Sequence, residues 1–335
     1  HLINDFRVYF AMPVSNKYRK FLNKNNFIKI AERKLSFLDL IRLIKFIKSN
    51  SITIIHAHGK GAGLIGRILS IFVNIPIIYT FHGIHISFYS KFLKKIYCIY
   101  ENLFGNIDSL KIFVSKSEKE IANQFFGIKN QNSLIINNAV LNRKILKTDL
   151  DQEKINQSIN IFNNSVNIIS MCRLVIQKNI YEILNIAKNL PEYNFIILGN
   201  GPLMSDLQDY LIEEKIVNIF MFGDCDNVFK YLYASKLYLS TSIYEGLSIS
   251  ILEAMSLGMP ILASKVVGNI DTVKHGKSGY LYELGDIESA KKYIKKILKD
   301  EKLYEYLSYS SQYIQRKNFS FNTMVSKYKQ VYNNY

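Results

Sequence analysis

The chain has 335 residues, and 48% of them are hydrophobic, which predicts a globular protein with two domains of ordinary size. Its three cysteines are scattered and form neither a disulfide framework nor a zinc-binding spacing, so a disulfide-stapled fold is excluded and a reducing cytosol is favoured. The uncharged stretch between Arg67 and Lys91 contains Asn74, Pro76 and Gly83. These polar and helix-breaking residues exclude a membrane-spanning helix there.

The formal net charge is +16, and most of it lies in the first part of the chain. Residues 1–140 carry 20 Lys and Arg against 7 Asp and Glu, whereas residues 141–335 carry 23 against 20. A lysine-rich composition explains many solvated lysines, but it does not predict so uneven a distribution. A basic first part favours an anionic partner, either a lipid surface or a nucleic acid. We expect no nucleic acid, because no helix-turn-helix, RNP-like or zinc-finger pattern occurs.

In chain order, short apolar runs with strand character alternate with helical patterns. Strands are expected over 51–58, 75–82, 111–115 and 133–136, and helices around 64–72 and over 118–126. Such alternation predicts a parallel sheet with helices on both faces.

Three glycines, Gly61, Gly63 and Gly66, follow the first of these strands in the spacing G-x-G-x-x-G. This spacing matches the dinucleotide-binding fingerprint, which also requires an acidic residue about 20 positions further on. The first acidic residue after Gly66 is Glu101. We therefore expect the glycines to allow close packing of a helix on a strand, or approach of an acceptor, rather than cofactor binding.

Residues 88–97 combine aromatic and lysine residues at helical spacing. An amphipathic helix of this kind can lie in a membrane interface. We expect its apolar residues to pack in the core instead, which is the commoner use of such a face.

The polar stretch 142–164 is expected to begin with the connection between two domains, and a second α/β unit is expected from Val166 onward. Helical patterns follow over 288–298 and 301–315, and a last one begins near Phe321.

Two glutamates in this second unit, Glu245 and Glu253, are eight residues apart. Glu245 is expected in a loop, and Glu253 is expected a turn inside a short helix that Gly258 and Pro260 end. The N–H groups of such a turn can bind an anion, and the carboxylates can accept hydrogen bonds from sugar hydroxyls. The alternative is a capping box, in which Ser250 caps the helix and Glu253 folds back onto its backbone.

Further motifs surround this pair: Arg173 precedes Lys178 by five residues, and Gly199, Gly201 and Pro202 form a Gly-x-Gly-Pro loop. Together with Glu-x7-Glu, they resemble the retaining glycosyltransferases of family 4. The resemblance covers most of the chain and is strongest over 170–285.

The resemblance implies an α/β protein of the GT-B fold, with two Rossmann-like domains facing each other across a cleft. The first domain, 1–142, would bind the acceptor, and the second, 143–318, would bind the nucleotide sugar. Residues 319–335 would form a helix that crosses back to the first domain. Because 6–11 resembles the second strand of such a fold, we expect about 30 preceding residues, a strand and a helix, to be missing.

The resemblance also implies roles for donor-binding residues. Glu253 would accept hydrogen bonds from the ribose, and Glu245 would hold a hydroxyl of the donor sugar. Arg173 and Lys178 would stabilise the departing diphosphate without a metal or another cofactor. The remaining donor contacts would come from the backbone of Gly201, Gly246, Leu247 and Ser248.

In the first domain, Thr80 and His82 match a Thr-x-His element of the family, in which the histidine faces the reaction centre. His82 would orient acceptor or donor, although a buried structural histidine is the alternative. His56 and His58 alternate along a strand end, and no Cys, Asp or Glu nearby completes a metal site. We expect them to be structural or to line the acceptor site.

The implied activity is retaining transfer of a hexosyl or N-acetylhexosaminyl group from a nucleotide sugar, with UDP as the expected nucleotide. The acceptor would be lipid-linked or an oligosaccharide, used in bacterial cell-surface polysaccharide synthesis. We expect a cytoplasmic protein, peripheral on the anionic inner face of the cytoplasmic membrane. The alternatives are a sugar-nucleotide epimerase of the same fold and a non-catalytic nucleotide-binding fragment.

Overall fold

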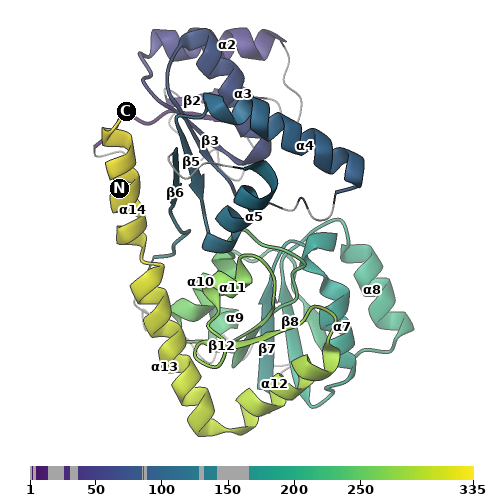
Figure 1. Ribbon diagram of the computed structural model, residues 1–335. Coiled ribbons are helices and arrows are strands. Elements are labelled where there is room, and N and C mark those ends of the chain that lie inside the picture. The colour runs from purple at the N-terminus through teal and green to yellow at the C-terminus, as the bar shows by residue number, and fades with distance from the viewer. Residues whose placement is uncertain are drawn as a thin grey trace. The chain divides into compact units, whose positions relative to one another are not determined.

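The computed structural model describes residue 2 and residues 5–13, 26–30, 37–84, 86, 89–127, 132–141 and 166–335. The chain divides into two compact units (Figure 1). The first unit consists of residues 1–137 and 322–335, and the second consists of residues 138–321. The expected domain limits lay at 142 and 318, within five residues of these divisions. The expected connection over 142–164 lies outside the described residues.

The first unit contains a four-stranded parallel sheet in the order β3-β4-β5-β6. Its strands are β3 (Ile55–His58), β4 (Ile77–Thr80), β5 (Leu110–Phe113) and β6 (Ser133–Ile135). A separate parallel pair is formed by β1 (Phe10–Met12) and β2 (Phe27–Lys29). The strand expected over 6–11 thus begins only at Phe10. The strand expected from residue 51 begins at Ile55, because Ser51 has a left-handed backbone (φ 50°) that no strand accepts.

In the described part of the first unit, five helices accompany these strands: α2 (Phe37–Ser49), α3 (Gly59–Val73), α4 (Lys91–Phe104), α5 (Lys116–Phe126) and α14 (Phe321–Asn333). A short 3-10 helix, η4 (Gly105–Ile107), follows α4. Val331 of α14 is buried against Ile78 and Ile112 of the sheet, and Tyr328 and Tyr332 pack beside it. Figure 1 shows α14 alongside this sheet. The sheet of the first unit is therefore covered in part by residues that follow the whole second unit in sequence.

The three glycines of the G-x-G-x-x-G spacing lie inside α3, not in a loop before it. A Cβ on Gly63 would lie 2.6 Å from the Tyr79 ring, and one on Gly66 would lie 2.7 Å from Ile77. The expected close packing of helix on strand is confirmed for these two positions. The helix was expected around 64–72, after the glycines, and this start is wrong, because α3 begins at Gly59, directly after the last residue of β3.

The first unit also buries an ion cluster, in which Arg67 contacts two carboxylates. Its Nε lies 2.8 Å from Asp108 Oδ1, and its Nη2 lies 2.6 Å from Asp108 Oδ2 and 2.8 Å from Glu101 Oε2. The guanidinium also lies over the rings of Tyr79 and Tyr100. All three charged side chains are almost fully buried, so the cluster joins α3 and α4 through the interior.

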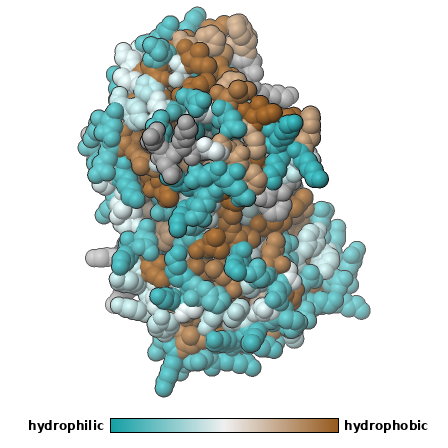
Figure 2. Space-filling model, in the orientation of Figure 1, coloured by the Kyte–Doolittle hydropathy of each residue, from teal (hydrophilic) through white to brown (hydrophobic). Residues whose placement is uncertain are grey.

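The expectation that the apolar residues of 88–97 pack in the core is wrong for the face of α4 that carries Phe92, although Tyr89 and Tyr97 do pack against the core. Phe92, Leu93, Ile96, Ile99 and Leu103 are all exposed, and Phe92 is 71% exposed. The helix buries its opposite face instead, where Tyr97 packs with Phe126 and Glu101 meets Arg67. Figure 2 shows apolar residues gathered on the surface of this unit where α2, α3 and α4 lie.

The second unit is built on a six-stranded parallel sheet in the order β12-β11-β10-β7-β8-β9. Its strands are β7 (Val166–Met171), β8 (Tyr193–Leu198), β9 (Ile219–Met221), β10 (Leu237–Ser240), β11 (Ile261–Ser264) and β12 (Gly279–Tyr282). The chain builds outward from β7 in one direction and then from β10 in the other. In doubly wound sheets, ligands bind where this direction reverses, at the carboxyl ends of the strands. Here that point lies between β7 and β10.

Seven helices and a 3-10 turn complete the described part of the second unit. They are η7 (Ile176–Lys178), α7 (Ile180–Lys188), α8 (Met204–Glu213), α9 (Phe229–Tyr233), α10 (Ile249–Ser256), α11 (Asn269–Thr272), α12 (Ile287–Lys299) and α13 (Glu301–Asn318). Buried residues of the strands and of α7 and α12 form one continuous apolar core. The loops at the carboxyl edge of the sheet are thus held on a rigid scaffold.

Candidate functional site

Two loops at the carboxyl ends of β7 and β8 approach each other closely. The N–H of Cys172 donates to Leu198 O and that of Leu174 donates to Asn200 O, both at 3.0 Å. A Cβ on Gly201 would lie 2.3 Å from the carbonyl oxygen of Leu174. Glycine at 201 is therefore required by the loop that carries Arg173. The expected passage of a nucleotide beside Gly201 stays a prediction.

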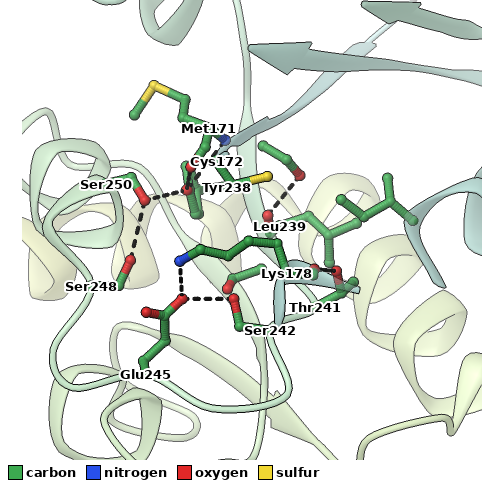
Figure 3. Close-up of a pocket in the computed structure, with 13 residues that line it drawn as sticks. Met171, Cys172, Lys178, Tyr238, Leu239, Thr241, Ser242, Glu245, Ser248 and Ser250 are labelled. Carbon is green, nitrogen blue, oxygen red and sulfur yellow. Dashed lines mark hydrogen bonds and ion pairs between the residues drawn. The ribbon is translucent and has the colours of Figure 1, made fainter. Parts of the chain in front are cut away.

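Lys178 and Glu245 lie together at the reversal point of the sheet. Lys178 Nζ is 2.5 Å from Glu245 Oε1, and Ser242 Oγ donates to the same oxygen at 2.7 Å (Figure 3). Glu245 is 7% exposed. A buried carboxylate needs such partners, because an unpaired charge in the interior is costly. The structure thus brings together two of the residues that the sequence singled out.

The loop that carries Glu245 is fixed from its other side by Gly268. The N–H of Glu245 donates to Val267 O at 3.1 Å. Gly268 has a φ of +84°, and a Cβ there would lie 2.7 Å from the carbonyl oxygen of Gly246. Gly268 permits this contact because it has no side chain and tolerates a positive φ. Gly246 itself is buried.

The helix that follows, α10, begins with Ser248 as its N-cap, whose Oγ accepts a hydrogen bond from Ile251 N–H. The alternative capping box, with Ser250 as the cap, is wrong, because Ser250 already lies within the helix. Leu247 and Ser248 are buried, whereas Glu253 is half-buried in the second turn. The first N–H groups of a helix lack intrahelical partners, so this end of α10 favours anions.

A chain of hydroxyl groups fixes the start of α10 to the sheet. Ser248 Oγ lies 3.1 Å from Ser250 Oγ, and Tyr238 OH of β10 lies 2.8 Å from Ser250 Oγ (Figure 3). Tyr238 also accepts a hydrogen bond from Met171 N–H. Burial raises the pKa of the Tyr238 hydroxyl well above its ordinary value, so it stays protonated and able to donate.

Two hollows adjoin these residues, and both include Met171 and Cys172 in their walls. The smaller one, about 10 Å³, lies between Lys178, Glu245 and the hydroxyl chain. The larger one, about 380 Å³, is open and is lined by Arg173, Asn200 and Asp224 among others. Arg173 is exposed, so its guanidinium is accessible from solvent.

The sequence motifs missed several residues of this site. Asn200, Asp224 and Cys225 line the larger hollow, and Ser242 holds Glu245. A usable signal was present for Asp224, since it follows the short apolar strand β9, and polar residues after a parallel strand meet at one edge of the sheet. Burial raises the pKa of the Cys172 thiol to about 11, so Cys172 is a neutral wall residue.

His82 belongs to the first unit, where it follows the carboxyl end of β4. Its ring is exposed and its Nε2 lies 3.0 Å from Nδ1 of His58. The alternative of a buried histidine is therefore wrong. His56 is bonded at both ring nitrogens, to Tyr332 OH at 2.6 Å and to Thr80 Oγ1 at 2.7 Å.

Within the described residues, no three His, Cys, Asp or Glu side chains form a group arranged to hold a metal ion. In the same part of the chain, no helix combines the length and apolar composition that crossing a bilayer requires.

Comparison with known families gives two matches along the chain. Residues 12–140 match the family model described as Glycosyltransferase Family 4, and residues 151–313 match that of Glycosyl transferases group 1. Together they span most of the sequence. The chain belongs to the family 4 glycosyltransferases.

Similar curated proteins include bacterial glycosyltransferases. UDP-Gal:alpha-D-GlcNAc-diphosphoundecaprenol alpha-1,3-galactosyltransferase of Escherichia coli is 29% identical over 310 residues, which cover 88% of this chain and 78% of that protein. The capsular polysaccharide biosynthesis glycosyltransferase CapM of Staphylococcus aureus is 24% identical over 88% of this chain and 80% of that protein. The relatives of this glycosyltransferase thus include enzymes named for polysaccharide synthesis.

Solved structures of the same fold resemble this glycosyltransferase over nearly its whole length. Anabaena HepE, in a complex with UDP and glucose, has a TM-score of 0.84 at 18% identity and covers 97% of this chain and 91% of its own. A glycosyltransferase from Rickettsia africae has a TM-score of 0.79 at 17% identity, covering 96% of this chain and 89% of its own. The expected GT-B fold class is confirmed.

Proposed function

We propose that this glycosyltransferase transfers a hexosyl or N-acetylhexosaminyl group from a UDP-sugar to a hydroxyl of a lipid-linked or oligosaccharide acceptor in cell-surface polysaccharide synthesis. The observation that carries the proposal is the placement of Lys178, Glu245 and the start of α10 at the reversal point of a doubly wound sheet. The printed name of the E. coli relative, with its UDP-Gal donor and diphosphoundecaprenol acceptor, supports the same substrate classes.

The donor diphosphate would lie at the start of α10, where Arg173 and Lys178 supply positive charge. The backbone N–H groups of Gly246, Leu247 and Ser248 would bind its oxygens. Negative charge grows on the diphosphate as the glycosidic bond breaks, and fixed cations stabilise it. Because the protein supplies these cations, we propose that donor binding requires no metal.

The sugar and nucleoside would lie on either side of the diphosphate. Glu245, held by Lys178 and Ser242, would accept a hydrogen bond from a sugar hydroxyl, and Glu253 would accept from the ribose. The nucleoside would enter the hollow beside Arg173 and Asn200, whose volume of about 380 Å³ suits a group of that size. His82 would hold a hydroxyl of the acceptor or donor sugar.

We further propose that the reaction retains the configuration at the anomeric carbon. The acceptor hydroxyl would attack from the face that the diphosphate leaves, and a diphosphate oxygen would take the acceptor proton. No carboxylate nucleophile is then needed. Glu245, paired with the Lys178 ammonium, serves as a hydrogen-bond acceptor.

A peripheral position on the inner face of the cytoplasmic membrane completes the proposal. It is supported by the exposed apolar stripe of α4 and by the lysines of its first turns, Lys91, Lys94 and Lys95. An apolar stripe flanked by lysines suits the boundary of an anionic bilayer.

Calorimetric titration of UDP in the presence of EDTA tests the donor site. We expect saturable binding that Glu253→Ala weakens about 10- to 100-fold, since hydrogen bonds to a charged group contribute about 1.5–3 kcal/mol. The matched control is Glu283→Ala, which removes an exposed glutamate paired only with surface Lys265. Absence of UDP binding, or equal weakening in both variants, would contradict the proposal.

An acceptor assay separates transfer from the alternatives. A transferase releases UDP from a UDP-sugar only when a hydroxyl acceptor is added. A sugar-nucleotide epimerase would change the donor without any acceptor, and a non-catalytic nucleotide-binding protein would do neither.

A further inference from the structure

Three histidine side chains gather at the carboxyl edge of the first unit's sheet. His56 and His58 lie two residues apart on β3, so their side chains point to the same face. In the parallel register His58 is opposite Thr80, and His82 follows two residues later. The ring centroids are 4.1 Å apart for His56 and His58 and 5.3 Å apart for His58 and His82.

The hydrogen bond between His58 and His82 occupies one ring nitrogen of each. Nδ1 of His58 lies 3.0 Å from Nε2 of His82. One nitrogen must donate and the other must accept, so the bond couples the tautomers of the two neutral rings: either His58 Nδ1–H donates to His82, or His82 Nε2–H donates to His58. Among the residues that the structure describes, none bonds the second ring nitrogen of His82, so it can bind a ligand.

The backbone beside His82 is held separately. Gly83 N–H donates to Glu118 Oε1 at 2.5 Å, and Val114 N–H donates to Glu118 Oε2 at 2.9 Å. The Glu118 side chain is fully buried at the start of α5. Because the main chain is already fixed by Glu118, the remaining freedom of His82 is rotation of its ring, which His58 restricts.

The surroundings keep the cluster uncharged near neutral pH. Crowding by the protein and the neighbouring His82 lower the pKa of His58 to about 4, although one edge of its ring is open to solvent. Burial and the neighbouring histidines lower the pKa of His56 to about 2. Desolvation by the protein atoms around its ring lowers the pKa of His82, although part of that residue is open to solvent. The groups that face the cluster from α14, Tyr328 and Tyr332, are phenols whose pKa is raised by burial.

We infer that His58 is a positioning residue for His82: it binds one ring nitrogen of His82 and thereby orients the other toward a sugar hydroxyl of the ligand. The inference rests on the proposed function, in which His82 holds such a hydroxyl. His58 itself does not contact the reacting atoms.

Histidine NMR of the ¹⁵N-labelled free protein tests the pairing without any activity measurement. In the wild-type protein the bond to His58 sets the ratio of the two His82 tautomers. His58→Leu removes the partner, and the ratio then shifts toward that of an unpaired imidazole. His58→Asn places a polar atom where Nδ1 lay and keeps the ratio near the wild-type value. Unchanged His82 signals in His58→Leu would overturn the inference.

Kinetics then test whether positioning matters for transfer. We expect His58→Leu to lower kcat by about 10- to 100-fold, since small misplacements of an active group have effects of this size. The dissociation constant of UDP stays unchanged, because the residues proposed to bind it all belong to the second unit. His58→Asn recovers most of the lost rate. The control His275→Asn changes a histidine of the second unit that accepts Leu281 N–H and packs beside Tyr280 and Tyr293, and its rate stays at the wild-type value.

Different results would contradict the positioning role of His58 and the proposed transferase function. If His58→Leu shows wild-type kcat while His82→Ala is slow, the positioning role is overturned and the role of His82 stands. If the wild-type protein binds no UDP, the proposed function falls, and the tautomer measurement alone decides whether His58 orients His82.

Discussion

Lys178 and Glu245 neutralise each other at the reversal point of the second unit's sheet. They are 67 residues apart in sequence, and their side chains are 19% and 9% exposed. A donor diphosphate would bring negative charge beside this pair, and Lys178 can contact it while Ser242 continues to hold Glu245. The lysine would therefore have two roles, to pair with a buried carboxylate and to attract an anion.

Replacing Lys178 and, as a control, a surface lysine shows whether Lys178 binds the donor directly or only adds to the positive charge of the protein. We expect Lys178→Met to weaken UDP binding about 10- to 100-fold, because a charge-assisted hydrogen bond is lost. Calorimetry measures the effect. The control is Lys265→Met, which removes an exposed lysine of the same unit and leaves UDP binding unchanged. Equal affinity in the Lys178 variant and the wild type would exclude Lys178 from the donor site.

Gly201 predicts a stability effect at the same edge of the sheet. Gly201→Ala places a Cβ 2.3 Å from the backbone oxygen of Leu174, and backbone cannot yield as a flexible side chain can. We expect a loss of about 1–3 kcal/mol in the free energy of unfolding, as for other overpacked sites. Urea denaturation measures it. Ser205→Ala, an exposed position in nearby α8, should stay within about 0.5 kcal/mol of the wild type.

Residue types and spacing indicated Lys178, Glu245 and Glu253 as site residues. They did not predict the ion pair between Lys178 and Glu245. The ion pair depends on β7 and β10 being neighbours, and the strand order cannot be derived from local sequence. Ser242 was missed although its partner Glu245 is three residues away, because both lie in a loop, where spacing does not fix which side chains meet. The contact of Gly268 with Gly246 was missed because the two glycines are distant in sequence. The capping-box interpretation of Ser250 failed because Ser248, two residues earlier, is an equally good N-cap.

Among the elements, α3 shows how close packing on a sheet restricts which residues a helix can have. Gly63 and Gly66 face Tyr79 and Ile77 of β4, whereas Gly61 has no atom within 4 Å of the position of a Cβ. Glycine is therefore needed at 63 and 66, where the helix contacts a strand, but not at 61, where a larger side chain would fit.

Alanine at these positions should have opposite effects. Gly61→Ala should stabilise the protein by up to about 1 kcal/mol, because glycine is the poorer helix former. Gly63→Ala should destabilise it, since its Cβ would lie 2.6 Å from the buried Tyr79 ring. Thermal unfolding followed by circular dichroism compares the two variants. A change of the same sign in both would mean that α3 does not pack on β4 through Gly63.

The ion cluster that joins α3 and α4 also leads to a prediction. Arg67→Met leaves the buried carboxylates of Glu101 and Asp108 without their main cation. We expect a loss of about 3–5 kcal/mol in the free energy of unfolding, measured by urea denaturation. Arg42→Met, which breaks an exposed pair with Asp39, should cost less than about 1 kcal/mol. Similar losses in both variants would contradict the buried character of the cluster.

Helical periodicity predicted the helix α4 but not which of its faces is buried. The spacing of apolar residues identifies one face, and it does not say whether protein, lipid or water covers that face. In α4 the face that the structure buries contains Tyr97 and Glu101, which the apolar pattern ranks below Phe92 and Ile96. Arg67, 34 residues away from Glu101, decides the orientation.

Over the whole molecule, positive charge and exposed apolar surface coincide in the first unit. Residues 1–140 hold 20 of the 43 Lys and Arg but only 7 of the 27 Asp and Glu. Leu64, Ile71 and Phe72 of α3 are also exposed, in addition to the apolar stripe of α4. Attraction between this charge and an anionic surface weakens with salt, because the Debye length is about 10 Å at 0.1 M.

Vesicle co-sedimentation tests this combination. We expect the protein to bind vesicles that contain phosphatidylglycerol at low salt, and to bind less as salt increases. Replacing both Phe92 and Ile96 by serine should reduce binding several-fold. Ile212→Ser, an equally exposed apolar position in α8 of the second unit, should have no effect. Indifference of the wild-type protein to these vesicles at low salt would contradict a membrane-bound position.

The path of the chain has a consequence for biosynthesis. Tyr328, Val331 and Tyr332 of α14 complete the apolar interior of the first unit, and Tyr332 also bonds His56. During translation, domains generally fold as their sequences emerge, the earlier one first. Here the ribosome must synthesise the entire second unit before it makes the helix that closes the first. The first unit, although most of it is translated first, thus reaches its native state last. Its sheet depends on a segment translated almost 200 residues after β6.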